Sequence, residues 1–67
     1  MNIKFNGEIK EIREESLNGV ISAYLNGKEP RGIAVALNAS IVPKQKWDET
    51  ILNENDEVEV VHAVQGG

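Results

Sequence analysis

Residues 57–67 have the sequence EVEVVHAVQGG, in which a β-branched run leads into two terminal glycines. The alternation of Glu with Val at its start is the period-two pattern of a strand that buries one face. We therefore expect a final strand that ends near Val64, followed by a short flexible tail of Gln65, Gly66 and Gly67. Because glycine has no Cβ, this tail would let another surface approach the main chain closely.

The expected tail places a main-chain carboxylate at Gly67, with no side-chain bulk beside the carboxyl carbon. An unperturbed terminal carboxyl has a pKa of about 3.3–3.7, so it is an anion at neutral pH. Most chain termini are frayed and carry no function. The choice between a functional tail and an inert one therefore depends on the rest of the chain.

A chain of 67 residues is expected to form one domain, and a domain near this size buries only about 60% of its unfolded surface. With no Cys and a single His, His62, it has neither a disulfide framework nor a zinc site. The core must therefore come from Ile, Val and Leu. The lack of Cys fits a reducing compartment. No apolar run approaches the roughly 20 residues that span a bilayer, and residues 1–7 show no signal-peptide pattern. We expect a cytoplasmic protein without a membrane segment.

The formal net charge is −4, from 7 Lys and Arg against 11 Asp and Glu. Domains that bind nucleic acid need a basic surface for the phosphate backbone, so this balance argues against that class. Most of the acids are expected to form a solvated face, and their sign favours a basic surface on any partner. They gather late in the chain, at Asp48, Glu49, Glu54, Asp56, Glu57 and Glu59.

Residues 2–5 and 8–13 flank an Asn6-Gly7 pair and are expected to form a β-hairpin. Asn-Gly is a strong signal for a type I′ turn, because both turn positions need a positive φ. A two-residue loop places Phe5 opposite Glu8 and leaves Ile9 on the other face of the sheet. A β-bulge would change that orientation, and both arrangements remain open.

A helix is predicted after Ser16, a favourable N-cap residue that follows two Glu residues. Gly19 weakens this helix by about 1 kcal/mol relative to Ala, and Asn26-Gly27 supplies a left-handed stop. The helix is short, so tertiary packing must hold it. Its apolar residues recur at helical spacing, at Leu17, Val20, Ile21 and Tyr24, with Leu25 beside them.

Residues 33–38 alternate as a strand, and Ala39-Ser40 is expected to turn the chain into a short strand at Ile41-Val42 that ends at Pro43. The following segment, residues 44–50, is expected to be irregular or a single helical turn. Its Trp47 should fill the core rather than lie at an interface. Ile51-Leu52 should return to the core before a loop at residues 53–56.

These elements predict an α+β fold in which one helix packs on one face of a mixed sheet of four or five strands. This is the β-grasp arrangement, formed by residues 1–67 as a single domain. The predicted core consists of Ile3, Phe5, Leu17, Val20, Ile21, Ile33, Val35, Leu37, Leu52, Val58 and Val60.

The other face of the sheet should have no covering element, and we call it the open face. Alternation from the inward positions places Ala34, Ala36, Glu59 and Val61 on it. The small alanines would make this face shallow, and Val61 would add an apolar contact beside the tail. We predict a docking surface for partner proteins here. The alternative is that the alanines are merely tolerated strand residues.

Other side chains give no strong indication of chemistry. His62 has no accompanying nucleophile motif, so a surface strand position is favoured over a general base. Lys44 and Lys46 are expected to be solvated. Asp48 and Glu49 are adjacent acids without a third ligand at metal-binding spacing.

Several short motifs occur together in this chain: Phe5-Asn6, Ala36-Leu37-Asn38, Ile41-Val42-Pro43 with Trp47 four residues after the proline, Asp56, and Gly66-Gly67. In these residues, and over essentially its whole length, the chain resembles the ubiquitin-like sulfur carrier proteins, closest to the ThiS family of thiamine biosynthesis. Gly19 and the loop at residues 28–32 depart from the family pattern.

The resemblance implies a carrier rather than an enzyme. A partner adenylating enzyme would use ATP to activate the Gly67 carboxylate as an acyl-adenylate, so the chain itself would hold no cofactor or metal. Sulfur from a cysteine desulfurase relay would convert the activated group to a thiocarboxylate, and thiazole synthase would accept that sulfur. The absence of Cys agrees with a carrier that needs no side-chain nucleophile.

Three alternatives remain open. One is sulfur carriage for another pathway, such as the small subunit of molybdopterin synthase, although a length of 67 residues mildly favours the thiamine role. Another is a protein modifier that is joined through Gly67 to lysines of other proteins. The last is an interaction domain with an inert tail.

Overall fold

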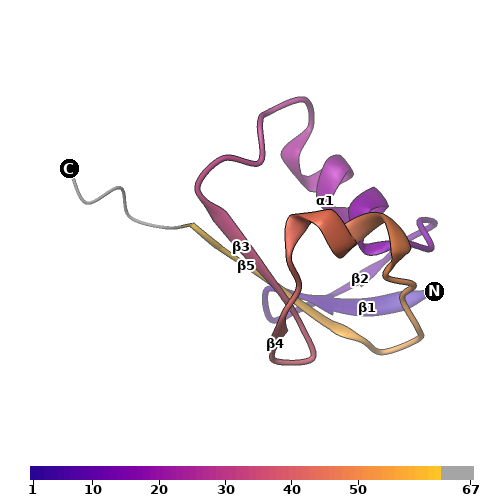
Figure 1. Ribbon diagram of the computed structural model, residues 1–67. Helices are drawn as coiled ribbons and strands as arrows, with labels where there is room; N and C mark the ends of the chain where they lie inside the picture. Colours follow the sequence, from indigo (N-terminus) through magenta and orange to yellow (C-terminus); the bar gives the residue numbers. More distant parts are fainter. Residues whose placement is uncertain (63–67) are drawn as a thin grey trace.

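A computed structural model describes residues 1–62 of the chain. Within this range five strands form one sheet in the order β2-β1-β5-β3-β4, with α1 and the 3₁₀ helix η1 lying together on one side of it (Figure 1). The predicted α+β class and β-grasp arrangement are confirmed, with five strands. The elements are β1 (Asn2–Phe5), β2 (Glu8–Glu11), α1 (Leu17–Leu25), β3 (Ile33–Leu37), β4 (Ser40–Ile41), η1 (Lys44–Glu49) and β5 (Glu57–His62).

The first hairpin has the predicted two-residue turn. Asn6 and Gly7 have φ values of 49° and 86°, and Phe5 lies opposite Glu8. The hairpin therefore contains no bulge. Ile9 lies opposite Lys4, on the open face, and is 77% exposed.

Helix α1 begins and ends as predicted. The Ser16 hydroxyl accepts a hydrogen bond from the Gly19 N–H at 3.1 Å, and Asn26 ends the helix in a left-handed conformation. A Cβ at position 19 would lie 3.0 Å from Cγ of Glu14. Gly19, predicted only to weaken the helix, therefore leaves room for the side chain of Glu14, which precedes the helix.

The second hairpin turns one residue earlier than predicted. Asn38 and Ala39 have φ values of 50° and 72°, and Leu37 lies directly opposite Ser40. The expected turn at Ala39-Ser40 is therefore wrong, and Asn38 belongs to the turn rather than to the strand. Asn adopts the left-handed conformation readily. Alanine rarely does, so the sequence does not indicate that Ala39 is the second residue of the turn.

The core lies between the sheet and the two helices. Trp47 is buried as predicted, and its indole N–H donates to the carbonyl of Val42 at 2.9 Å. Ile33 and Leu37 pack at the margin of the core and are only partly buried. The buried residues are Ile3, Phe5, Leu17, Val20, Ile21, Val35, Trp47, Leu52, Val58 and Val60.

Ile51 does not enter the core, so the prediction that Ile51-Leu52 does so holds only for Leu52. Ile51 is 60% exposed and forms an isolated antiparallel bridge with Ser16. Neighbouring side chains in extended backbone point in opposite directions, so only one of the two can face inward. No helix within residues 1–62 has the length and apolarity needed to cross a membrane.

Candidate functional site

Strand β5 is the central strand of the sheet, between β1, to which it is parallel, and β3, to which it is antiparallel. Its last residue is His62, which lies opposite Ile33 of β3. The predicted tail and modification site, Gln65, Gly66 and Gly67, lie outside the described residues. The candidate site is therefore the end of β5 together with the surfaces around it.

Asn6 supports β5 beyond the point where β1 ends. The pairing of β1 with β5 stops at Phe5 and Val58. The N–H of Asn6 then donates to the Val58 carbonyl at 2.9 Å, and its side-chain Oδ1 accepts from the N–H of Val60 at 2.8 Å. The Asn6 side chain thus takes the place of a backbone carbonyl that a longer β1 would offer to the Val60 N–H. In residues 1–62, no strand continues the pairing on this edge beyond Val60.

Asn38 and Asp56 hold the other end of β5. The side-chain amide of Asn38 donates to Asp56 at 3.1 Å, and its Oδ1 accepts from the N–H of Glu57 at 2.9 Å. The second carboxylate oxygen of Asp56 accepts from the N–H of Asn53 at 2.8 Å. Both residues belong to the family resemblance, and here they fix the position at which β5 begins.

The four residues predicted for docking are neighbours on the open face. Ala34 pairs with Val61, and Ala36 pairs with Glu59, across β3 and β5. Val61 is 57% exposed, and both alanines are half-buried. The predicted orientation is therefore correct, and the docking role itself remains a prediction.

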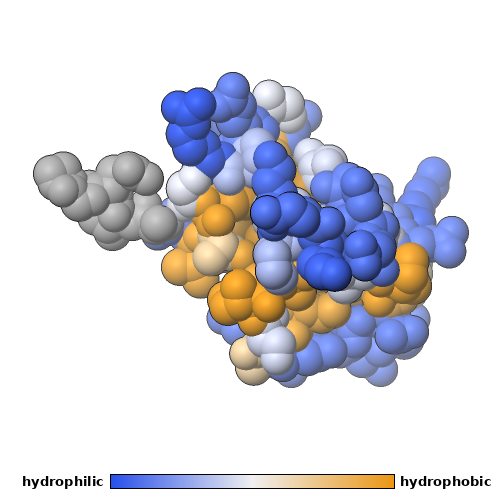
Figure 2. Space-filling view, in the orientation of Figure 1, coloured by the Kyte–Doolittle hydropathy of each residue, from blue (hydrophilic) through white to orange (hydrophobic). Residues whose placement is uncertain are grey.

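Ile41 extends this face and was not among the predicted residues. It lies opposite Ala36 in the short strand β4 and is 67% exposed. Strand alternation places it there with either turn position, because its partner would be Asn38 with the predicted turn and is Ala36 in the structure, and both share the face of Ala34. Figure 2 shows hydrophobic surface over β3, close to the place where β5 ends.

On the opposite side of the sheet, His62 contacts Tyr24 of α1. The Tyr24 hydroxyl lies 3.0 Å from Nε2 of His62, and the Tyr24 ring also packs on Phe5, with 5.2 Å between the ring centroids. His62 is an exposed strand residue, as predicted. Its contact with Tyr24 joins residues 38 positions apart, so no local sequence pattern predicts it.

The acidic pair Asp48-Glu49 lies on the surface of η1. Asp48 and Glu49 are both exposed, and Glu49 lies 3.8 Å from the Lys46 ammonium. Within residues 1–62, no three His, Cys, Asp or Glu side chains are grouped so as to hold a metal ion.

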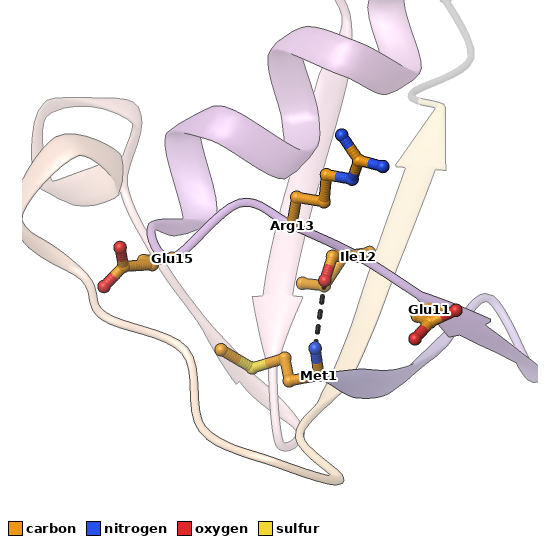
Figure 3. A pocket seen from close by; sticks show the side chains of 5 residues that line it. All are labelled: Met1, Glu11, Ile12, Arg13 and Glu15. Atoms are coloured by element: carbon orange, nitrogen blue, oxygen red, sulfur yellow. Dashed lines mark hydrogen bonds between the residues drawn. The ribbon is translucent and has the colours of Figure 1, made fainter.

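A shallow pocket lies at the far end of the sheet (Figure 3). Between two of its lining residues, the Met1 ammonium donates a hydrogen bond to the Ile12 carbonyl at 3.0 Å. Because β1 and β5 are parallel, residues that precede β1 lie near the start of β5 rather than its end (Figure 1). This pocket is therefore not part of the candidate site. Its lining residues are Met1, Glu11, Ile12, Arg13 and Glu15.

The fold and the site define a small β-grasp protein, in which the central strand leads to the C-terminal residues beside an open, partly apolar sheet face. A family model described as the ThiS family matches residues 3–67. The chain belongs to the ThiS family. Membership of this family supports a sulfur carrier role, and ThiS-family proteins work with partner enzymes in thiamine biosynthesis.

The chain is also similar to individual proteins. An uncharacterized protein, ycf40, from Porphyra purpurea is 30% identical over 67 residues, which cover all of this chain and 93% of that protein. The crystal structure of the thiamine biosynthesis protein ThiS from Geobacter metallireducens matches with a TM-score of 0.83 at 24% identity, covering 100% of both chains. A solution structure of a thiamine biosynthesis protein from the same organism matches with a TM-score of 0.73 at 24% identity, covering 100% of this chain and 88% of that one. These structural matches show the fold.

Proposed function

We propose that this chain is a sulfur carrier protein of thiamine biosynthesis, and that the carboxylate of Gly67 is the group that carries the sulfur. The observation that carries the proposal is the extent of the family match, which runs over residues 3–67 and so includes Gly66-Gly67. The chain acts as a co-substrate of its partner enzymes rather than as an enzyme. Its cytoplasmic location is part of the same proposal.

The chemistry uses the carboxylate as a nucleophile and then as an electrophile. A carboxylate oxygen of Gly67 attacks the α-phosphate of ATP on an adenylating enzyme, and pyrophosphate leaves. The terminal sulfur of a persulfide, supplied by a cysteine desulfurase relay, attacks the acyl carbon, and AMP leaves. A thiol reductant cleaves the resulting S–S bond, and thiazole synthase accepts sulfur from the thiocarboxylate. The partner enzymes supply the ATP, the Mg²⁺ and the groups that stabilise the phosphates.

The open face supports this proposal because two of its residues, Glu59 and Val61, belong to β5, the strand that leads to Gly67. The adenylating enzyme and the sulfur acceptor must each hold that strand in order to direct the same carboxylate. We therefore assign the docking of both partners to Ala34, Ala36, Glu59 and Val61. The exposed Glu59 favours a basic residue on each partner surface.

The test is exchange of pyrophosphate into ATP, measured with the cognate adenylating enzyme. Deleting Gly67, or adding one residue after it, should abolish the exchange, because neither variant presents the same carboxylate. Glu11→Ala is the matched control, since Glu11 is exposed and pairs with Asn2 at the far end of the sheet. Thermal unfolding should be the same for all of these proteins. Undiminished exchange with the extended chain would contradict the proposal.

A further inference from the structure

Tyr24 lies at the margin of the core rather than within it. The other inward residues of α1, Leu17, Val20 and Ile21, are buried, whereas Tyr24 is 40% exposed. Its ring nevertheless packs on Phe5 and faces His62, with 6.4 Å between the centroids of the Tyr24 and His62 rings. Its hydroxyl lies 3.0 Å from His62 Nε2. The residue thus connects the last turn of α1 to the last residue of β5.

Within residues 1–62, His62 has less backbone support than the rest of β5. On one side it lies opposite Ile33 of β3. On the other side, the support from the first hairpin stops at Val60, where the Asn6 side chain accepts the N–H. Strand ends with few backbone hydrogen bonds open most easily. The contact with Tyr24 is therefore a side-chain link at a place where the backbone ladder is incomplete.

We propose that Tyr24 is a positioning residue that keeps His62 on the sheet and so fixes the position of the strand residue that precedes the C-terminal segment. The proposal rests on the proposed function and deepens it. If His62 opens, a partner enzyme must order this residue when it binds the chain. Ordering one backbone residue costs the equivalent of roughly 5- to 30-fold in affinity. The apparent affinity is therefore proportional to the fraction of molecules in which His62 is already on the sheet.

Amide hydrogen exchange measures this link without any partner. The Val60 N–H points to Asn6, and N–H directions alternate along a strand, so the N–H groups of Val61 and Glu59 face β3. Val61 is therefore the probe of the strand end, and Glu59 is an internal reference. Tyr24→Phe keeps the ring and removes only the hydroxyl. Exchange at Val61 should become roughly 2- to 10-fold faster, the effect of one net hydrogen bond, with exchange at Glu59 unchanged.

The second readout is the kinetics of adenylation. Tyr24→Phe should raise the KM of the adenylating enzyme for this chain by about 2- to 5-fold, because removal of the hydroxyl makes the open form of His62 at least as common as the closed form and only the closed form is competent. The kcat should stay within about twofold, since the chain bound at saturation is the same. A loss of core stability would instead raise exchange throughout the domain.

Variants at His62 provide the matched controls. His62→Gln retains a polar side chain within reach of the Tyr24 hydroxyl and should keep the slow exchange at Val61, whereas His62→Leu should not. Adding Tyr24→Phe should make exchange at Val61 faster in the His62→Gln variant and should not change it in the His62→Leu variant.

Three results would overturn the proposal. These are unchanged exchange at Val61 in folded Tyr24→Phe, faster exchange with an unchanged KM, and a uniform rise in exchange that includes Glu59. Failure of the pyrophosphate-exchange test with Gly67 variants would overturn the proposed function but would leave the exchange result at Val61 intact. The two failures are therefore distinguishable.

Discussion

Asn6 and Val60 are 54 positions apart in the chain, yet the side-chain Oδ1 of Asn6 accepts a hydrogen bond from the N–H of Val60 at 2.8 Å. The same asparagine forms the left-handed turn of the first hairpin. One residue therefore closes the hairpin and extends the support of the central strand.

Replacing Asn6 by Gly should destabilise the domain by about 1–3 kcal/mol, because the Val60 N–H loses its acceptor while the turn keeps its conformational freedom. Asn6→Asp is the matched control, since it keeps an oxygen acceptor and also tolerates a positive φ. Urea unfolding measures both variants. Equal stability of Asn6→Gly and the parent chain would show that the bond to Val60 contributes nothing.

The two hairpin turns provide a reciprocal test. Gly7→Ala should destabilise the domain by about 1–2 kcal/mol, because Gly7 has φ 86° and a Cβ there would meet no atom within 4 Å, which leaves backbone strain as the only cost. Ala39 has φ 72°. Ala39→Gly should therefore stabilise by up to about 1 kcal/mol, after the added entropy of the unfolded chain is subtracted. Thermal melts of the two variants should move in opposite directions, and a shift in the same direction would refute the argument.

The orientation of the sheet faces can be tested on neighbouring strands. Val35 is 1% exposed, so Val35→Ala should cost about 1–3 kcal/mol through lost burial and a residual cavity. Glu57→Ala should have little effect, because the hydrogen bond at Glu57 is made by its backbone N–H rather than its side chain. The denaturation midpoint is the measurement. Equal midpoints for the two variants would mean that the inward face is wrongly assigned.

If the open face docks both partners, one substitution on it should weaken binding to both. Ala36→Arg and Val61→Asp should each weaken binding to both the adenylating enzyme and the sulfur acceptor, while the melting temperature changes little. Ile51→Asp is the matched control, because it also places a charge at an exposed apolar residue but lies outside the sheet. Calorimetric titration gives each affinity. Unchanged binding by folded Ala36→Arg and Val61→Asp would remove this face from the mechanism.

The features that the sequence predicted well are those with a local pattern. Alternation identified Val58 and Val60 as buried, and the Asn6-Gly7 pair identified the first turn. The second turn was placed one residue late, because its second residue, Ala39, is not one of the residues that favour a positive φ. The shift changes the partner of Ile41 from Asn38 to Ala36 but leaves Ile41 on the open face.

The supports of β5 could not be predicted in the same way. The contact between Tyr24 and His62 joins residues 38 positions apart, and the bond between Asn38 and Asp56 joins residues 18 positions apart. Such pairs depend on the register of the sheet and on the placement of the helix over it. A pattern within a short window carries neither piece of information.

The most direct test of the central claim is the intact mass of the chain purified from its native host. A sulfur carrier should show a population in which one oxygen of the Gly67 carboxylate is replaced by sulfur, and mild alkylation should label that C-terminus alone, since the chain has no Cys. A mass that corresponds only to the oxygen form, or Gly67 found joined to lysines of other proteins without any thiocarboxylate, would contradict the account.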